Sequence, residues 1–396
     1  MKNENLVPKV RFKGFSDPWE QRKLQQIANV FDGTHQTPQY VPSGVPFLSV
    51  ENIRTLETDK YISEGAFQEN FKVVPQKGDI FMTRIGDIGT ANIVKSNDDL
   101  AYYVSLALIK PERIKSQYLA YFLSSPSGQS QLWKRTLHVA FPKKINKNEI
   151  GKIDISFPDS GEQEKIGISI TKLSDLIAAN EDKLEQLKML KKLLMQKIFS
   201  QEWRFKGFTD PWEQRKLVDL TNVKDGTHDS PKYQSSGIPL VTSKNLTPEG
   251  LTLNKALLIS NADYDRINQR SKVDAGDIIF GMIGTIGNPV LVTHANFGIK
   301  NVALIKNSKK INNLFLLELL KSSVFSRYVF RENAGGTQKF LSLNIIRKFQ
   351  FRLPNIHEQK HIGNSLMLLN NLIAANEDKL QQLKELKKYL MQNMFV

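Results

Sequence analysis

The sequence has 396 residues and contains no cysteine. This absence excludes disulfide bonds, thiolate-ligated zinc or iron–sulfur sites, and a cysteine nucleophile. The six histidines do not form an H-E-x-x-H motif or a similar metal-ligand spacing. We therefore expect no metal centre in this chain.

Long apolar runs are missing as well. No run of 18 apolar residues occurs, whereas a membrane-spanning helix needs about 20. The initial segment MKNENLVPKVRF lacks the apolar core of a secretory signal. These two absences predict a soluble protein of the cytoplasm.

Motifs for nucleotide hydrolysis and base methylation are also absent. There is no GxxxxGK followed by Ser or Thr, and the Gly-rich segment 281–287 has GxxGxxG spacing, which we interpret as a tight turn between strands. Residues 17–19 (DPW) lack the second proline of the Asp/Asn-Pro-Pro-aromatic motif of amino-group methyltransferases. The acids at 181–182 lie more than 20 residues from Asp159 on one predicted helix, which fits solvated helix charges better than a nuclease site.

Basic side chains outnumber acidic ones by 55 to 40, so the formal net charge is +15. The excess lies in residues 1–158, with a net charge of +5, and in residues 204–354, with +10. Residues 159–203 (−1) and 355–396 (+1) are nearly neutral. A basic globular segment indicates a polyanionic partner, most often nucleic acid. A basic protein without such a partner is the alternative.

The chain is a tandem repeat. Residues 11–24 (RFKGFSDPWEQRKL) return as residues 204–217 with one difference, and residues 176–196 return as residues 372–392 with three. The tails thus repeat at an interval of 196 residues. This interval indicates a duplicated domain, because the units of a solenoid have only about 20–50 residues.

The two copies differ in their interiors. Residues 61–74 and 258–272 have little in common, and the same holds for residues 126–147 and 324–343. Two similar scaffolds therefore present two different surfaces. From the repeat we expect two globular and two helical segments in alternation: residues 1–158, 159–203, 204–354 and 355–396.

Each copy ends in a predicted long helix. Asp159 followed by Glu162, and Asn355 followed by Glu358, match the N-cap and N3 positions at which helices begin. A helix of about 39 residues would be roughly 58 Å long. Such a helix is too long to lie on one small domain.

One apolar stripe runs along each predicted helix. Apolar residues recur at intervals of three and four over residues 173–198 and 369–394. Asn180 and Asn376 interrupt the stripes at matching places, and a buried asparagine in a coiled coil costs stability but determines register. We expect the two stripes to pack against each other, and the alternative is two separate helices on their own domains.

The globular segments combine expected strands and helices, which predicts a mixed α/β (α+β) fold. An apolar run follows each Gly-Asp turn, at residues 78–79 and 276–277, and is expected to form a strand. The other expected elements are buried strands at 106–110 and 302–306 and helices at 118–124 and 314–322.

Three loops in each half carry groups that suit nucleic acid. The first contains Thr34 and His35, and its copy contains Thr227 and His228. Glycine, hydroxyl and imidazole groups in one turn offer hydrogen-bond donors for a phosphate. The alternative is a turn that is capped by its own hydroxyl group.

The second candidate is Arg84, at the turn of a Gly-rich hairpin in the first half. An arginine can bind guanine through two hydrogen bonds. The second half has Met282 at this position. Such a role would therefore belong to one half only.

The third loop spans residues 133–144 in the first half and residues 331–340 in the second. Basic residues alternate there with hydroxyl, amide and glycine groups, which suits contact with a DNA groove; an ordinary basic loop is the alternative. The candidate DNA-binding residues are Lys134, Arg135, His138, Lys143 and Lys144 in the first copy, and Arg331, Thr337, Gln338 and Lys339 in the second.

With these features in this order, the chain resembles the specificity subunit of type I restriction-modification systems over its whole length. The resemblance rests on paired variable domains, paired helical tails and a set of phrases that recurs in both halves. These phrases are Trp19-Glu20 with Leu24, Gly33-Thr34-His35, Gly44-Val45-Pro46, Gly78-Asp79-Ile80, and Pro158 with Glu162 and Gln163. The first half departs from the pattern, since residues 136–142 (TLHVAFP) stand where the second half has GGTQ at 335–338.

The resemblance implies a fold and a function. Each globular segment would be a target recognition domain that reads one half of a bipartite, asymmetric DNA site. The helices would form an antiparallel coiled coil that holds the domains apart, with a pseudo-twofold relation between the halves.

The resemblance also implies partners and their cofactors. Two modification subunits would carry S-adenosylmethionine and methylate adenine, and restriction subunits would translocate DNA with ATP and Mg²⁺. The chain itself would hold no cofactor and would catalyse nothing.

Two other classes of protein remain open at this stage. A stand-alone DNA methyltransferase or nuclease with degenerate motifs would carry the same basic charge. An assembly protein whose coiled coil merely pairs two domains would contain the same helices.

Overall fold

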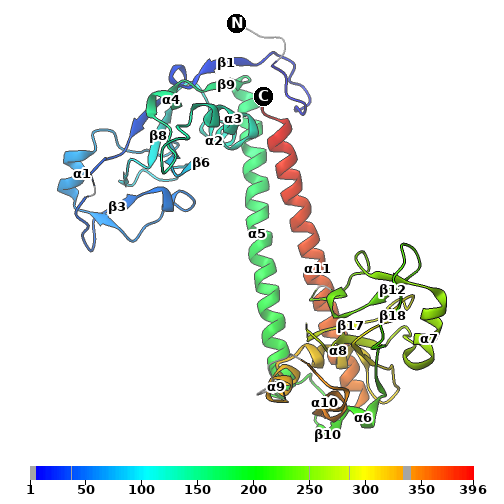
Figure 1. Ribbon diagram of the computed structural model, residues 1–396. Coiled ribbons are helices and arrows are strands. Elements are labelled where there is room, and N and C mark those ends of the chain that lie inside the picture. The colour runs from blue at the N-terminus through cyan, green and yellow to red at the C-terminus, as the bar shows by residue number, and fades with distance from the viewer. Residues whose placement is uncertain (1–5, 37, 249, 285, 333–339) are drawn as a thin grey trace. The chain divides into compact units, whose positions relative to one another are not determined.

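The computed structural model describes residues 6–36, 38–248, 250–284, 286–332 and 340–396. The chain divides into two compact units, Met1–Glu181 with Asp378–Val396 (unit 1) and Asp182–Glu377 (unit 2). The helices α5 (Ser160–Phe199) and α11 (Ile356–Asn393) each contribute one part to either unit, because the unit boundaries fall within them (Figure 1). No helix in the described ranges combines the length and the apolar character that crossing a membrane requires.

Unit 1 contains short strands and short helices before α5. Its strands are β1 (Glu20–Lys23), β2 (Ala28–Asp32), β3 (Val45–Leu48), β4 (Tyr61–Ile62), β5 (Ile80–Ile85), β6 (Asp87–Ile93), β7 (Ala101–Tyr102), β8 (Leu106–Pro111) and β9 (Asp154–Phe157). Its helices are α1 (Glu64–Asn70), α2 (Ser116–Ser124), α3 (Pro126–Arg135) and α4 (Lys147–Gly151), with 3-10 turns η1 (Leu24–Gln26) and η2 (Val50–Asn52). The main sheet is antiparallel with the order β2-β8-β5-β6. A smaller sheet has the order β4-β3-β7, and β1 pairs with β9.

Strand β5 supplies side chains to two separate cores of unit 1. Ile80 and Met82 pack in the cluster that contains Tyr118 of α2. Phe81 points to the opposite face and contacts Tyr102 of β7, with the two ring centroids 5.0 Å apart. Since alternate side chains of a strand point to opposite faces, a continuous apolar run is required where both faces are covered.

Unit 2 repeats this architecture. Its strands are β10 (Glu213–Lys216), β11 (Val223–Asp225), β12 (Ile238–Val241), β13 (Leu246–Thr247), β14 (Gly250–Leu251), β15 (Leu257–Ile259), β16 (Ile278–Gly281), β17 (Gly287–Leu291), β18 (Gly298–Ile299), β19 (Val302–Ile305) and β20 (Gln350–Leu353). Its helices are α6 (Leu217–Leu220), α7 (Asn261–Ser271), α8 (Asn313–Lys321), α9 (Ser323–Glu332) and α10 (Leu343–Lys348), with the 3-10 turn η3 (Ser243–Asn245). The main sheet has the order β11-β19-β16-β17, and the smaller sheets are β15-β12-β18, β13-β14 and β10-β20.

The elements expected from the sequence are confirmed. The apolar runs after the Gly-Asp turns form β5 and β16, and the expected buried strands are β8 and β19. The two expected short helices are α2 and α8, with ends that lie within two residues of the expected ones. The prediction of a mixed α and β fold is therefore correct.

The starts of both long helices are capped as predicted. Asp159 accepts hydrogen bonds through Oδ1 from the backbone N–H groups of Gly161 (2.8 Å) and Glu162 (3.1 Å). Asn355 accepts one from the N–H of Glu358 (2.9 Å). These side chains satisfy N–H groups that have no partner within the helix.

The glutamate at the N3 position of each cap binds an arginine of the repeated phrase, the name we give to residues 11–24 and their copy at 204–217. Arg11 donates to the carboxylate of Glu162 through Nε (2.9 Å) and Nη2 (2.8 Å). Arg204 donates to Glu358 in the same way (2.9 and 2.6 Å). Both carboxylates are buried, so these bidentate pairs attach the repeated phrase to the first turn of each helix.

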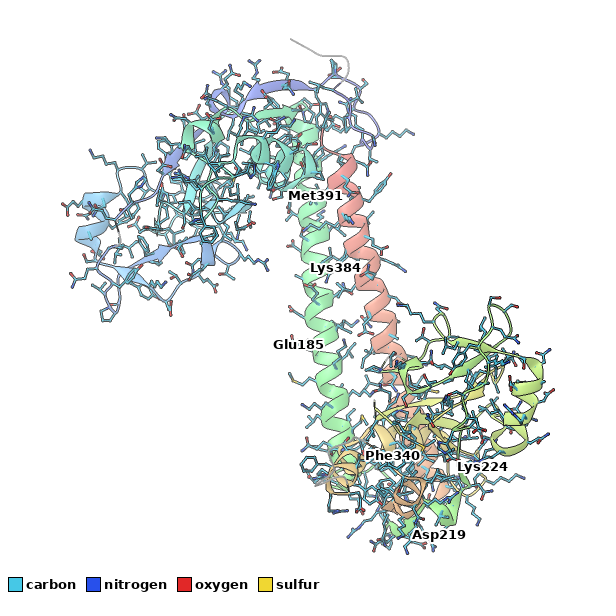
Figure 2. The ribbon with its side chains drawn as sticks, viewed as in Figure 1. Glu185, Asp219, Lys224, Phe340, Lys384 and Met391 are labelled. Carbon is cyan, nitrogen blue, oxygen red and sulfur yellow. The ribbon has the colours of Figure 1, made fainter. Side chains whose placement is uncertain are left out.

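The two long helices are antiparallel within each unit. In unit 1, Ile170 of α5 and Met394 after α11 share one core. Further along α5 the carboxylate of Glu181 binds Nζ of Lys384, which Figure 2 labels on α11, at 2.6 Å. In unit 2, Lys188 Nζ binds Glu377 at 2.6 Å. This pair is the repeat copy of the first, with 196 residues between equivalent positions. The expected pairing of the helices is therefore confirmed.

The asparagines of the apolar stripes are buried in this pairing. Asn180 donates to the carbonyl of Leu176 (2.7 Å), and Asn376 donates to that of Leu372 (2.6 Å). Each amide group thus finds its partner one turn back in its own helix. In the register of the two helices, Glu181 lies beside Lys384 and Lys188 lies beside Glu377.

The ends of the long helices complete the core of each unit. Phe395 packs against Tyr118 and Phe122, with ring centroids 5.4 and 6.3 Å apart. In unit 2, Phe199 packs against Phe315 of α8 at 5.7 Å. The last residues of one repeat thus become core residues of the other.

We predict that Glu162→Ala strongly destabilises unit 1. The carboxylate is fully buried, so its loss leaves Arg11 with an unpaired charge that is only 12% exposed; such losses cost about 3–5 kcal/mol. The matched control is Glu20→Ala, which removes a half-exposed pair with Arg22 and should cost at most about 1 kcal/mol. Hydrogen exchange of peptides from β5 and β8 measures the free energy of opening in each variant. Equally small losses in Glu162→Ala and Glu20→Ala would contradict the prediction.

Candidate nucleic-acid interface

The first candidate loop of unit 1 is held against strand β7. A side-chain carbon at Gly33 would lie 2.3 Å from the carbonyl oxygen of Tyr102, so only glycine fits there. The N–H of Thr34 donates to the same carbonyl (3.1 Å). The hydroxyl of Thr34 accepts from the N–H of Gln36 (3.3 Å), as in a self-capped turn. His35 is exposed on this turn.

The copy of this loop in unit 2 has the same turn but a different histidine environment. The hydroxyl of Thr227 accepts from the N–H of Asp229 (3.2 Å). His228 lies between two partners, with Nε2 2.8 Å from Asp225 Oδ2 and Nδ1 2.8 Å from the side-chain oxygen of Asn301. Both threonine hydroxyls therefore accept a hydrogen bond within their own turns, and His228 is tied to the scaffold. Contact of these residues with DNA stays a prediction.

Arg84 is not a surface residue, and its expected role as a guanine reader is corrected. Its side chain is only 7% exposed, and the guanidinium donates to the carbonyl of Ile145 through Nε (3.1 Å) and pairs with Asp32 through Nη1. Arg84 lies within β5, and the hairpin turn itself is at Gly86. The arginine therefore joins the first loop, the hairpin and the end of the third loop.

Unit 2 neutralises the equivalent aspartate from a different element. Asp225 Oδ1 binds Nη2 of Arg270 in α7 at 2.6 Å. Met282, at the position of Arg84, is buried instead. The sequence indicated this difference, because the second repeat has an aspartate, Asp225, at the position of Asp32 but no arginine at the position of Arg84. Arg270 itself was not among the expected residues.

The third loop of unit 1 folds back beside the hairpin turn. The N–H of Leu137 donates to the carbonyl of Lys144, and the N–H of Gly86 donates to that of Lys143, both at 2.8 Å. Between these anchors, Val139 and Phe141 are fully exposed, at 98% and 104%. We call this segment, residues 137–144, the tip loop.

Most of the predicted basic residues of the third loop are exposed around the tip loop. Lys134, Lys143 and Lys144 are exposed, and Lys143 Nζ lies 5.0 Å from the ring centroid of Trp133. The His138 ring packs against the same tryptophan in a tilted arrangement, with the ring centroids 4.1 Å apart and the planes at 52°. Together these groups form a positively charged surface on which a planar aromatic side chain is also accessible.

Arg135 has a structural role, which corrects its expected place in the interface. Its guanidinium donates to the side-chain oxygen of Gln131 (2.7 Å) and lies 3.3 Å from Asp154 of β9. It therefore fastens the end of α3 to the β1–β9 pair.

The third loop of unit 2 is described only at its two ends. Arg331 is exposed, with its guanidinium 5.8 Å from the ring centroid of Tyr328. Thr337, Gln338 and Lys339 lie outside the described residues. Phe340, which Figure 2 labels, forms a bridge with Ile283. This is the place at which Lys144 bridges Ile85 in unit 1.

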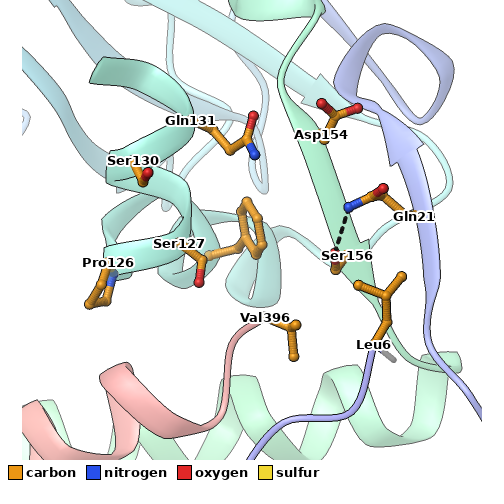
Figure 3. Close-up of a pocket in the computed structure, with 10 residues that line it drawn as sticks. Leu6, Gln21, Pro126, Ser127, Ser130, Gln131, Asp154, Ser156 and Val396 are labelled. Carbon is orange, nitrogen blue, oxygen red and sulfur yellow. Dashed lines mark hydrogen bonds between the residues drawn. The ribbon is translucent and has the colours of Figure 1, made fainter. Parts of the chain in front are cut away.

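A pocket of about 360 Å³ lies in unit 1 between α3, β9 and Val396 (Figure 3). Gln21, Ser130 and Gln131 line it with amide and hydroxyl groups. Its carboxylate, Asp154, binds Lys23 Nζ at 2.7 Å besides Arg135. The pocket therefore offers hydrogen-bonding groups but no free acid. In the described part of the chain, no three His, Asp or Glu side chains gather to hold a metal ion.

We predict that Arg84→Met destabilises unit 1 more than Arg270→Met destabilises unit 2. The guanidinium of Arg84 is buried and also donates to the carbonyl of Ile145, whereas the side chain of Arg270 is 63% exposed. Asp225 keeps its hydrogen bond with His228 Nε2 when Arg270 is lost. Expected losses are about 2–4 kcal/mol for Arg84 and at most about 1 kcal/mol for Arg270. Hydrogen exchange of β2 and β11 peptides compares the two, and the reverse order would refute this assignment.

Two specificity subunits from Methanocaldococcus jannaschii are similar to this chain. The type I restriction enzyme MjaVIII specificity subunit is 23% identical over 370 residues, which cover 87% of this chain and 84% of the relative. The putative type I restriction enzyme MjaX specificity subunit is 24% identical over 428 residues, which cover 98% and 95%.

A solved structure has the same fold along the whole chain. The S subunit of a type I restriction-modification system from M. genitalium has a TM-score of 0.67 at 14% sequence identity, and the likeness covers 99% of each chain. At this identity, the likeness concerns the fold alone.

One family of sequences matches both halves of the chain, at residues 16–189 and 209–385. The family is described as the type I restriction modification DNA specificity domain. The two matches begin 193 residues apart, which is the interval between the repeated phrases at Arg11 and Arg204. Since the matches cover most of the sequence, the chain belongs to the family of type I restriction-modification DNA specificity proteins.

Proposed function

We propose that each unit of this DNA specificity subunit reads one half of a bipartite, asymmetric site on double-stranded DNA. One observation carries the proposal: in both units the C-terminal end of the third loop is bridged to the hairpin at the same place, through Ile85–Lys144 and Ile283–Phe340. The loop sequences before these bridges differ, since TLHVAFP at 136–142 stands where the second half has GGTQ at 335–338. Equal scaffolds with different loops are suited to reading two different half-sites.

The charge distribution supports DNA as the partner. The excess of basic residues lies in residues 1–158 and 204–354, which contain the loops, and not in the helical segments. In unit 1 the exposed lysines at 134, 143 and 144 surround one loop. Lysines that contact phosphates release counterions and contribute affinity that does not depend on sequence.

The paired helices support two copies of one partner. Leu190 and Leu193 of unit 2 are exposed apolar side chains, and their repeat copies in unit 1, Leu386 and Tyr389, are exposed as well. Equivalent surfaces in equivalent units are suited to two identical subunits. We assign them to two modification subunits, which restriction subunits would join in the cytoplasm.

In this proposal the chain is non-catalytic. S-adenosylmethionine would be bound by the modification subunits, and ATP and Mg²⁺ by the restriction subunits. A stand-alone methyltransferase or nuclease is the less favoured alternative, because the sequence lacks the corresponding motifs.

Exchange of one domain tests the proposal. Replacing residues 25–157 by the corresponding segment of another specificity subunit should change one half of the methylated motif and leave the other half unaltered. Methylome sequencing of cells that express the full system measures this. Cells that lack the modification subunits serve as the control and should show no methylation. A change in both halves would contradict independent reading.

Substitution of the exposed basic residues tests their contact with DNA. Each of Lys143→Ala, Lys144→Ala and Arg331→Ala should weaken binding to all duplexes and lower the salt slope of log K by about 1. If one of them contacts a base instead, it should relax specificity at one position by about 1–3 kcal/mol. Lys95→Ala is the control, because this exposed lysine follows the end of β6 that lies away from the hairpin turn. Unchanged affinity and slope for all three variants would show that these side chains point away from DNA.

A further inference from the structure

The tip loop of unit 1 presents apolar side chains where a basic surface is otherwise expected. Val139 and Phe141 are exposed over their whole surface, and Trp133 at the base of the loop is 60% exposed. Single exposed apolar residues are common on proteins. Here two of them lie two residues apart at the end of one loop, with an exposed tryptophan at its base, and we call Val139 and Phe141 the apolar projection.

The base of the tip loop is firmly anchored. Leu137 bonds to Lys144, and Gly86 of the hairpin turn bonds to Lys143, both through the backbone. Ile145, the next residue, is buried, and its carbonyl accepts from Arg84. The apolar residues are thus held out from the scaffold by a structured base, which lowers the entropy lost when a partner binds.

The charges around the projection select the kind of partner. The exposed charged side chains nearest to it along the chain are Lys134, Lys143 and Lys144. No acidic residue occurs between Glu112 and Glu149. A partner that fits must therefore be anionic and must also offer an apolar surface. The bases of duplex DNA, between two phosphate chains, have both properties.

We propose that Phe141 and Val139 are specificity-determining residues that make direct apolar contact with bases of the half-site read by unit 1. This inference rests on the proposed function and names the contact that the lysines cannot supply. Apolar side chains recognise the methyl group of thymine in the major groove or enter between base pairs and open a base step. The lysines on either side bind the phosphates and hold the projection against the bases.

The contact should be separable from the phosphate contacts by its salt dependence. An apolar contact releases no counterions, so its loss lowers affinity without changing the salt slope. Lys143→Ala, in contrast, changes the slope. A failure of the apolar contact and a failure of DNA binding as such therefore give different results.

The test uses the full chain with its modification subunits and a duplex that carries the motif methylated in cells. Phe141→Ser should weaken specific binding by about 5- to 50-fold at an unchanged salt slope. Val139→Thr, which keeps the shape of the side chain, should weaken it less. Phe141→Leu should keep most of the affinity. The matched control is Val7→Thr, at another exposed valine of unit 1, which should have no effect.

Two modified duplexes distinguish the two forms of base contact. Uracil in place of thymine in this half-site should weaken binding of the unaltered protein but not of Phe141→Ser, if the methyl group is the partner. 2-Aminopurine in the half-site should brighten on binding of the unaltered protein only, if a base step is opened. Either response supports the proposal.

Three results would overturn the proposal. The first is that Phe141→Ser binds the specific duplex as tightly as the unaltered protein, while Lys143→Ala still lowers the salt slope. The second is the absence of a response from both modified duplexes. The third is that Phe141→Ser loses binding to phosphatidylglycerol vesicles but keeps its binding to DNA. The tip loop would then be a membrane contact.

Discussion

The buried carboxylates of Glu162 and Glu358 organise both units. Each is enclosed at the first turn of a long helix and takes two hydrogen bonds from the arginine that opens the repeated phrase. A buried carboxylate without such a partner is strongly destabilising, so the phrase and the helix start depend on each other. The strand at the end of each phrase, β1 or β10, pairs with the strand that precedes the helix, β9 or β20, and this closes the unit. This mutual dependence explains why the repeated phrases are nearly identical in the two copies.

The same scaffold tolerates different solutions where the loops meet. The aspartate at the end of β2 or β11 is neutralised in both units, by Arg84 from β5 in one and by Arg270 from α7 in the other. The requirement is a positive charge beside the carboxylate, and either element can supply it. The hairpin of unit 2 can therefore have Met282 at the position of Arg84, and its sequence is free to diverge.

The repeated phrases are nearly constant, whereas the loops differ between the two units. This division suits a protein that recognises DNA in two parts. In unit 1, Arg84 and Arg135 are used within the scaffold. The exposed lysines and the apolar residues of the tip loop, in contrast, are available to a partner. Basic residues inside a variable segment thus belong to two populations, and only their burial and partners separate a structural cation from one that is free to bind.

The sequence by itself determined the duplication, the mixed fold, the capped starts of the long helices and the apolar stripes, because each depends on local patterns or on comparison of the two copies. The strand β5 and the cap at Asp159 could be read directly from neighbouring residues. Only the tertiary structure decided that Arg84 is buried and that Phe141 is exposed. Their exposure depends on strands and loops more than 50 residues away in the sequence. The contact of Phe395 with Tyr118 likewise joins the last residues of the sequence to α2 in the first half, and no local pattern carries that information.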